Sequence, residues 1–172
     1  MPDVSKIWPV QVKPLDSVTP HPENFREHDI GAIAHSIELW GVWRPLVIQQ
    51  STNFVIVGCG EWKALAALHR SEAPMYFMDV DDRNARAILL ADNWIPSRGR
   101  NMPEELLQLM QELREDADLF TGTGADDDDV EALERELEEA DKPLKLDSRK
   151  MVRKRKVTCP ECGHKFEIGG KT

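Results

Sequence analysis

Short apolar runs separated by turn residues fill the first 96 residues of the chain. Apolar and polar residues alternate over 10–18, which predicts a short edge strand. The apolar runs 44–50 and 54–57 flank a polar tripeptide, and this spacing favours a β-hairpin. A further run at 75–80 predicts a third strand, so we expect this part of the chain to build a small sheet.

Three segments between and after these strands have helical spacing. The first starts after Asp29, carries isoleucines on one face and ends at Gly41. The second covers 61–69, with leucines on one face and alanines throughout. The third covers 81–93 and opens with two aspartates suited to a helix N-terminus. Strands and helices therefore alternate over this part of the chain.

Two amphipathic helices are expected beyond residue 96. One opens at Pro103, and the other is capped by the aspartates at 126–129. Residues 104–141 hold 16 Asp and Glu against 2 Lys and Arg, so these helices are strongly acidic. We expect an α+β domain at 1–96, an acidic helical extension at 97–141, a basic linker at 142–156 and a small unit at 157–172.

The net charge of −9 hides a division along the chain. Residues 144–172 hold 9 Lys and Arg against 3 Asp and Glu. The acidic and basic segments are expected either to attract each other or to contact different partners, the basic one a polyanion. No run of 18 apolar residues and no signal-peptide pattern is present, which predicts a cytoplasmic protein without membrane contact. Three cysteines do not make a disulfide framework.

The stretch FVIVGCGEWKALAALH, residues 54–69, joins a strand to a helix through a Gly-Cys-Gly turn. A strand, a tight glycine turn and a helix start form a common phosphate-binding arrangement, because the first amides of the helix point at the anion. The first charged residue after this turn is Glu61, however, where a phosphate site favours a base.

Several segments together resemble the N-terminal domain of ParB-type partition proteins, which has the ParB/sulfiredoxin fold. The resemblance implies an α+β fold with a small mixed sheet. They are, in order, the loop TPHPENFREHD, then GVWRPLVI, the glycine turn, WKA, MDVDD and LLADN. The resemblance covers residues 10–95. The acidic extension to about residue 140 looks most like phage-encoded ParB-like proteins, often labelled nucleases. This implies a DNA-associated protein of phage or mobile-element type in a bacterial host cell.

The resemblance also implies a pocket for a nucleotide such as CTP. The family's Gly-x-x-Arg segment falls on Gly58 to Glu61, so a carboxylate replaces the arginine beside the phosphates. At an effective dielectric of about 20, a unit charge about 4 Å away is worth roughly 4 kcal/mol, so the reversed sign disfavours CTP hydrolysis and clamp formation. The implied nucleotide-binding positions are Arg26, Arg44, Gly58, Cys59, Gly60, Lys63 and Asn93.

Whether the chain is an enzyme stays open at this point. Cys59 falls on the nucleophile position of sulfiredoxins, but a small residue fitting a tight turn is the better interpretation, since Glu61 opposes a thiolate. Glu61 is also the one candidate catalytic carboxylate of a metal-dependent nuclease. Other acids that such a nuclease would have at hand are Asp79, Asp81, Asp82 and Asp92, of which Asp81 and Asp82 are better interpreted as helix caps.

The C-terminal segment KVTCPECGHKFEI has the spacing of a zinc knuckle. Two thiolates separated by two residues can reach one Zn²⁺, so Cys159 and Cys162 are the expected ligands. His164 is a candidate third ligand, and the remaining ligands could come from a second chain in a homodimer. A degenerate knuckle without metal is the alternative.

A dense basic run precedes this knuckle. Such a run favours salt-dependent, largely sequence-independent contact with the phosphates of DNA, while a solvated linker folding back on the acidic helices is the alternative. A third class of function is an acidic interaction module that binds a host or phage protein. The basic residues expected to contact nucleic acid are Arg149, Lys150, Arg153, Lys154, Arg155 and Lys156.

Overall fold

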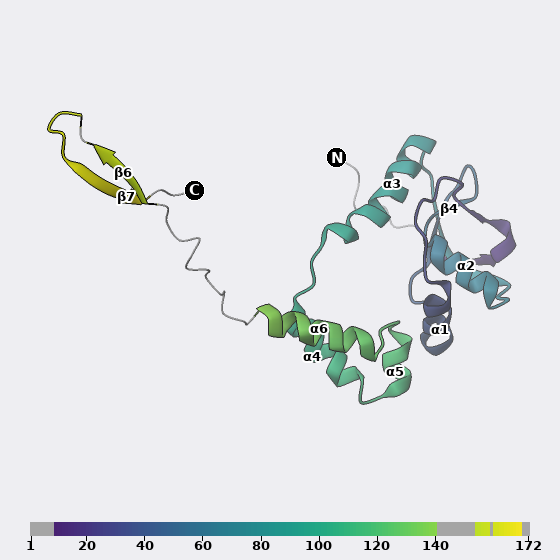
Figure 1. Ribbon diagram of the computed structural model, residues 1–172. Helices are drawn as coiled ribbons and strands as arrows, with labels where there is room; N and C mark the ends of the chain where they lie inside the picture. Colours follow the sequence, from purple (N-terminus) through teal and green to yellow (C-terminus); the bar gives the residue numbers. More distant parts are fainter. Residues whose placement is uncertain (1–8, 141–153, 159, 170–172) are drawn as a thin grey trace. The chain divides into compact units, whose positions relative to one another are not determined.

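The structure, a computed structural model, describes residues 9–140, 154–158 and 160–169. The chain forms two compact units, Met1–Leu137 and Glu138–Thr172. The first contains a five-stranded sheet and the second a two-stranded one (Figure 1). Within the described ranges, no helix is long and apolar enough to cross a membrane.

The sheet of the first unit is mixed, as the resemblance implies. Its strands are β1 (Gln11–Pro14), β2 (Thr19–Pro20), β3 (Leu46–Gln49), β4 (Phe54–Val57) and β5 (Glu72–Met78). Their order is β1-β5-β3-β4-β2, which confirms β1 as an edge strand. β3 and β4 form the predicted antiparallel hairpin, and β3 runs parallel to β5.

The core lies on the central strands. Leu46, Val55 and Met75 have no exposed surface, and Leu65 from the following helix packs against them. Each such side chain contributes about 1.5–3 kcal/mol by leaving water. In the sequence, the central strands are continuous apolar runs because both faces of a central strand are covered in the fold.

Three helices belong to this core: α1 (Ile30–Trp40), α2 (Cys59–Ala67) and α3 (Asp82–Trp94). The predicted caps are confirmed, since the carboxylates of Asp29 and Asp81 accept hydrogen bonds from amides three residues on, at 2.9 and 2.8 Å. The predicted start of α2 at residue 61 is wrong by two residues. The chain changes direction at Gly58 alone, through its left-handed backbone conformation, so α2 begins at the next residue.

The acidic extension contains α4 (Pro103–Leu113), α5 (Ala117–Gly122) and α6 (Asp127–Ala140), one helix more than the sequence predicts. α5 packs on α1: Thr121 Oγ1 lies 3.2 Å from His35 Nε2, and a Cβ on Gly122 would lie 2.5 Å from Leu39 Cδ1. Any larger residue at this position would have to displace the Leu39 and Trp40 side chains, so α5 packs closely on α1. The spacing of apolar residues does not reveal α5 because it is too short to show a period.

The second unit contains the antiparallel strands β6 (Lys154–Thr158) and β7 (Lys165–Gly169). They flank the turn of the CPECGH motif. The division of the chain into four segments stays a prediction, beside the two compact units.

Candidate functional site

The glycine turn between β4 and α2 is held tightly by the core. Gly58 has φ of +89°, a left-handed conformation that glycine adopts without strain. A Cβ at this position would lie 2.8 Å from Leu46 Cδ2, and Leu46 is fully buried. The turn therefore depends on glycine for its backbone and for its packing.

Gly60 lies under the loop that precedes α1. A Cβ on Gly60 would lie 2.9 Å from the His28 ring and 3.0 Å from Ile33 Cδ1. No side chain of any size fits here while the loop stays in place. Burial and the nearby Arg26 lower the pKa of His28, so its ring favours the neutral form in this position.

Cys59 is buried in the first turn of α2, with 3% of its surface exposed. Its Sγ lies 3.2 Å from the carbonyl oxygen of Val55, to which the thiol donates. Burial raises the pKa of Cys59, the opposite of what a reactive thiolate requires. The geometry favours the interpretation of Cys59 as a small residue that packs in the turn.

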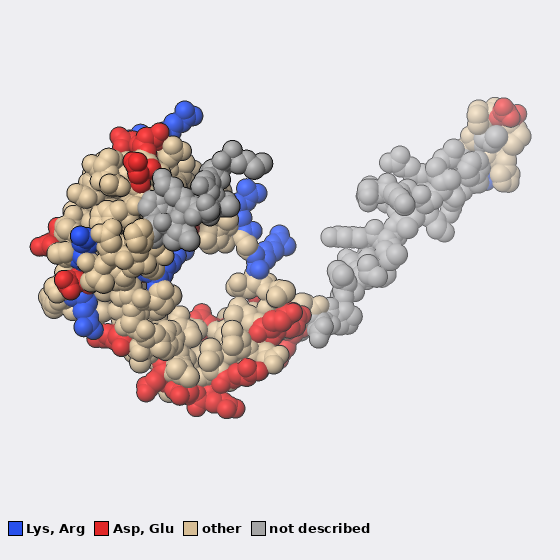
Figure 2. All heavy atoms as spheres, turned by 180° about the vertical axis from the view of Figure 1, so that it is seen from behind, with Lys and Arg blue, Asp and Glu red and all other residues tan. Residues whose placement is uncertain are grey.

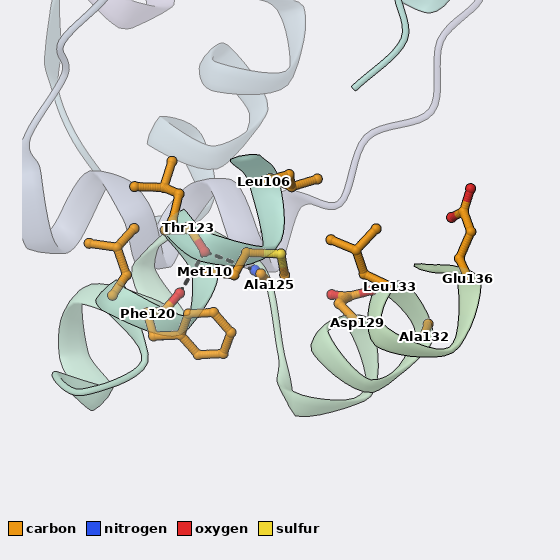
Figure 3. Close-up of a pocket in the computed structure, with 11 residues that line it drawn as sticks. Leu106, Met110, Phe120, Thr123, Ala125, Asp129, Ala132, Leu133 and Glu136 are labelled. Atoms are coloured by element: carbon orange, nitrogen blue, oxygen red, sulfur yellow. Dashed lines mark hydrogen bonds between the residues drawn. The ribbon is translucent and has the colours of Figure 1, made fainter. Parts of the chain in front are cut away.

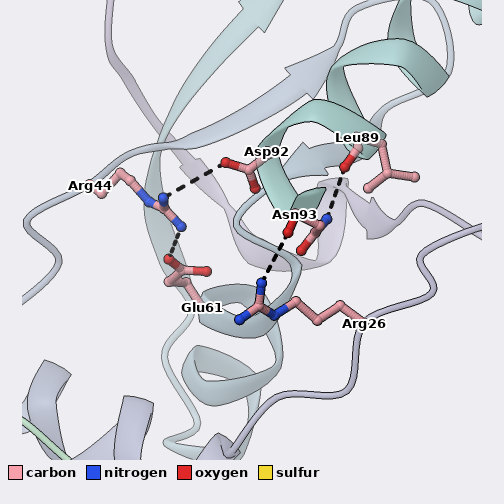
Figure 4. A network of polar contacts seen from close by, with 6 residues as sticks. All are labelled: Arg26, Arg44, Glu61, Leu89, Asp92 and Asn93. Carbon is pink, nitrogen blue, oxygen red and sulfur yellow. Dashed lines mark hydrogen bonds and ion pairs between the residues drawn. The ribbon is translucent and has the colours of Figure 1, made fainter. Parts of the chain in front are cut away.

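Glu61 points across the turn to Arg44, which enters from the loop before β3 (Figure 4). Arg44 donates to Glu61 Oε1, and its other terminal nitrogen lies 3.9 Å from Asp92 Oδ1 at the end of α3. Burial raises the pKa of Asp92, with Arg44 opposing the shift. The arginine that could hold a phosphate is therefore shared between two carboxylates.

Arg26 approaches the same place from the loop before α1. Its guanidinium donates to the carbonyl oxygen of Asn93 at 3.3 Å, while the Asn93 amide donates to Leu89 O at 2.9 Å (Figure 4). The side-chain oxygen of Asn24 is buried, and it has no hydrogen-bond partner among the residues that the structure describes. Asn24 thus has a free acceptor beside the turn, suited to a donor such as an amino group.

A small cavity of about 20 Å³ lies among these side chains. Of the positions implied by the resemblance, Arg44, Gly58, Cys59 and Asn93 line it, together with Glu61. Arg26 reaches it only through Asn93, whereas Gly60 and the exposed Lys63 do not line it. In this state the cavity is far below the size of a nucleotide pocket, which is about 300 Å³ or more.

The structure adds three residues to the site: Asn24, His28 and Asp92. Asn24 belongs to the loop that carries the resemblance, and Asp92 is among the available carboxylates, so each has a weak signal in the sequence. His28 belongs to the same loop, but its place over Gly60 does not follow from the sequence, because it depends on the return of the chain 32 residues later. Asp79 is exposed and does not line this cavity.

The predicted tail sites are only partly described. Arg149, Lys150, Arg153 and Cys159 lie outside the described residues. The backbone of Lys154 and Arg155 is in β6, and Lys156, Cys162 and His164 are exposed. Within the described residues, no group of three or more His, Cys, Asp or Glu is placed to hold a metal ion. Because Cys159 is not among them, the zinc knuckle stays a prediction.

Comparisons with known proteins agree with this fold. The chain is 27% identical over 85 residues to the probable chromosome-partitioning protein ParB of Campylobacter jejuni, an alignment covering 46% of this chain and 31% of the relative. It thus spans about a third of that relative's length.

A similar solved structure is that of the C-terminally truncated chromosome-partitioning protein ParB from Caulobacter crescentus complexed with CTP-gamma-S. It matches with a TM-score of 0.61 and 19% identity, covering 76% of this chain and 79% of that one. Residues 3–94 match the ParB N-terminal domain. The chain therefore belongs to the ParB N-terminal domain family.

Proposed function

We propose that this ParB-family protein associates with DNA through its basic segment, and that its glycine turn no longer serves as a triphosphate site. The observation that carries the part about the turn is the pairing of Arg44 with Glu61 across it. A triphosphate would have to displace Glu61 and would meet the Asp92 carboxyl nearby. The turn keeps the backbone of a phosphate site while its charges oppose a phosphate.

The charge distribution supports the choice of the basic segment over the acidic helices. Figure 2 shows Asp and Glu side chains gathered along α4–α6, at the lower edge of the first unit. Such a surface repels a phosphate backbone, whereas six cations between residues 149 and 156 attract it. Contact of this kind is largely independent of DNA sequence. A protein of phage or mobile-element type, working in the cytoplasm of a bacterial host, fits the acidic extension.

The test is a fluorescence-anisotropy titration of the full chain onto a labelled random-sequence duplex, at low and moderate salt. The variant Arg149→Gln/Arg153→Gln/Arg155→Gln should bind more weakly, and its salt slope should fall by about 0.9 for each phosphate that is no longer neutralised. The control, Arg83→Gln/Arg98→Gln/Arg100→Gln, removes the same charge from exposed sites of the first unit. Equal weakening in both variants, or no binding at low salt, would overturn the proposal.

A further inference from the structure

An apolar groove of about 500 Å³ lies between α4, α5 and α6 of the acidic extension (Figure 3). Leu106, Leu109, Met110 and Leu113 of α4 line one wall, and Leu133 of α6 lines the other. Phe120 lies at its base and is almost fully buried. The whole groove belongs to the first unit and consists of described residues.

The apolar face of α4 is not covered by the rest of the described chain. None of its residues is buried, and Leu109 is 53% exposed. The two walls are connected by polar contacts, the Arg114–Asp127 ion pair at 2.8 Å and a hydrogen bond from Gln111 to Glu134 at 3.0 Å. These exposed contacts link α4 to α6 beside the groove.

The Thr123 hydroxyl, at the base of the groove, already has hydrogen-bond partners. The Thr123 hydroxyl donates to Phe120 O at 2.6 Å and accepts from Ala125 N at 3.1 Å (Figure 3). A small-molecule site needs a few free polar groups to orient its ligand, and this groove offers none at its base. An apolar helix face, by contrast, needs only a groove that takes its anchor side chains.

Negative charge surrounds the groove. Residues 103–137 hold 13 Asp and Glu against 2 Arg. Both arginines are engaged, Arg114 with Asp127 and Arg135 with the carbonyl oxygen of Glu131. Asp129 and Glu136 lie on the groove itself, where a bound segment would meet them. A second copy of the same extension would bring the same negative charge against this face, so self-association through it is disfavoured.

We propose that this groove is a docking site for a basic amphipathic helix of a partner protein. Leucine-like anchors at i, i+3, i+4 and i+7 would fill the groove, and lysines or arginines on either side of them would face the acidic rim. The charges speed the encounter and select basic partners, while the apolar anchors supply the affinity. The proposal does not depend on DNA binding or on the state of the glycine turn.

The test uses the full chain and a labelled synthetic helix of leucine and lysine with leucines at this spacing. A scrambled peptide of the same composition is the probe control. Leu109→Gln should weaken binding about tenfold, since it removes an exposed anchor contact and keeps a good helix former. Leu119→Gln is the matched control, because Leu119 is 40% exposed and does not line the groove.

Two double variants, each lacking two negative charges, test whether the acidic rim of the groove contributes to peptide binding. Asp129→Asn/Glu136→Gln should weaken binding about threefold and flatten its salt dependence. The side-chain oxygen of an asparagine can still accept the hydrogen bond that Asp129 takes from Asp126 N, so the start of α6 is preserved. Asp118→Asn/Glu131→Gln removes the same charge from exposed sites outside the groove and should change affinity less than twofold.

Three results would overturn the proposal. One is equal binding of the scrambled peptide, or unchanged affinity in Leu109→Gln. Another is a wild-type dimer in sedimentation velocity that Leu109→Gln converts to a monomer, because a second copy would then fill the groove. The last is a gain of about tenfold in Arg149→Gln/Arg153→Gln/Arg155→Gln, which would make the chain's own basic segment the occupant.

Discussion

Arg44 and Glu61, 17 residues apart in the chain, form an ion pair across the turn between β4 and α2. Arg44 is half exposed, while Glu61 has only 19% of its side chain exposed. The carboxylate therefore lies on the protein side of the pair and the guanidinium on the solvent side. An incoming phosphate would find the guanidinium already neutralised.

Replacing Glu61 should restore anion binding at the turn. In Glu61→Gln the repulsive charge is removed and Arg44 becomes free to contact a phosphate. We expect wild type to bind CTP weakly, and the variant to bind at least about tenfold more tightly, measured by calorimetry. Glu72→Gln is the control, since Glu72 is exposed on β5 and does not line the cavity.

The outcome that contradicts this interpretation is tight CTP binding by wild type that Glu61→Gln does not improve. The Glu61 carboxylate would then move away from the turn when the nucleotide binds, and the cavity would be small only in the nucleotide-free protein.

Local features of the fold could be predicted from the sequence, whereas pairings over long distances could not. The helix caps at Asp29 and Asp81 join residues three positions apart, and the hairpin joins neighbouring strands through a short polar link. The Arg44–Glu61 pair and the His28–Gly60 contact join segments that meet only in the folded chain. The resemblance implies that an arginine is missing from the turn, but only the folded chain shows that the carboxylate in its place binds Arg44.

Gly58 should be the least replaceable glycine of the turn. Gly58→Ala strains the left-handed backbone and places a Cβ 2.8 Å from the fully buried Leu46. Gly124→Ala is the control, because Gly124 also has positive φ but its Cβ would meet its nearest atom, on Ala32, at 3.4 Å. We expect Gly58→Ala to lower the free energy of unfolding by about 1–3 kcal/mol more than the control does. Urea unfolding measures the difference, and equal losses of stability would show that Leu46 yields freely.

We expect the buried Asp92 carboxyl to lower the free energy of unfolding at neutral pH, where it is ionised. Its pKa is raised above the ordinary value of 3.8, first by burial, so the folded state binds a proton more readily than the unfolded state. Stability from this group is therefore present below pH 3.8 and falls as pH rises through the folded pKa.

Asp92→Asn removes this penalty. Its gain in unfolding free energy should be larger at pH 7 than at about pH 4.5, in urea titrations at both values. Asp79→Asn is the control, since Asp79 is exposed and lies outside the cavity. A decrease of stability in Asp92→Asn at pH 7 would mean that the contact with Arg44 outweighs burial.

The CPECGH motif should bind zinc. Metal analysis of the full chain, purified without chelator, should find one Zn²⁺ per chain, or one per two chains if a dimer completes the ligand set. Cys159→Ser/Cys162→Ser should lose the metal. Cys59→Ala should keep it, because Cys59 is buried in the other unit. A metal content of zero in wild type, or its loss in Cys59→Ala, contradicts the assignment.

Glu61 should not act as a nuclease residue. Glu61 already accepts a hydrogen bond from Arg44 at one of its two carboxylate oxygens, and a metal ion there would lie beside the guanidinium charge. The same guanidinium lies near Asp92, so a cation placed between the two acids would have to displace a positive charge. We expect any Mg²⁺- or Mn²⁺-dependent cleavage of plasmid DNA in the preparation to be the same for wild type, Glu61→Gln and Glu72→Gln. Cleavage that disappears only in Glu61→Gln would establish catalysis at this turn, and the Arg44 pair would then be a resting state that the metal opens.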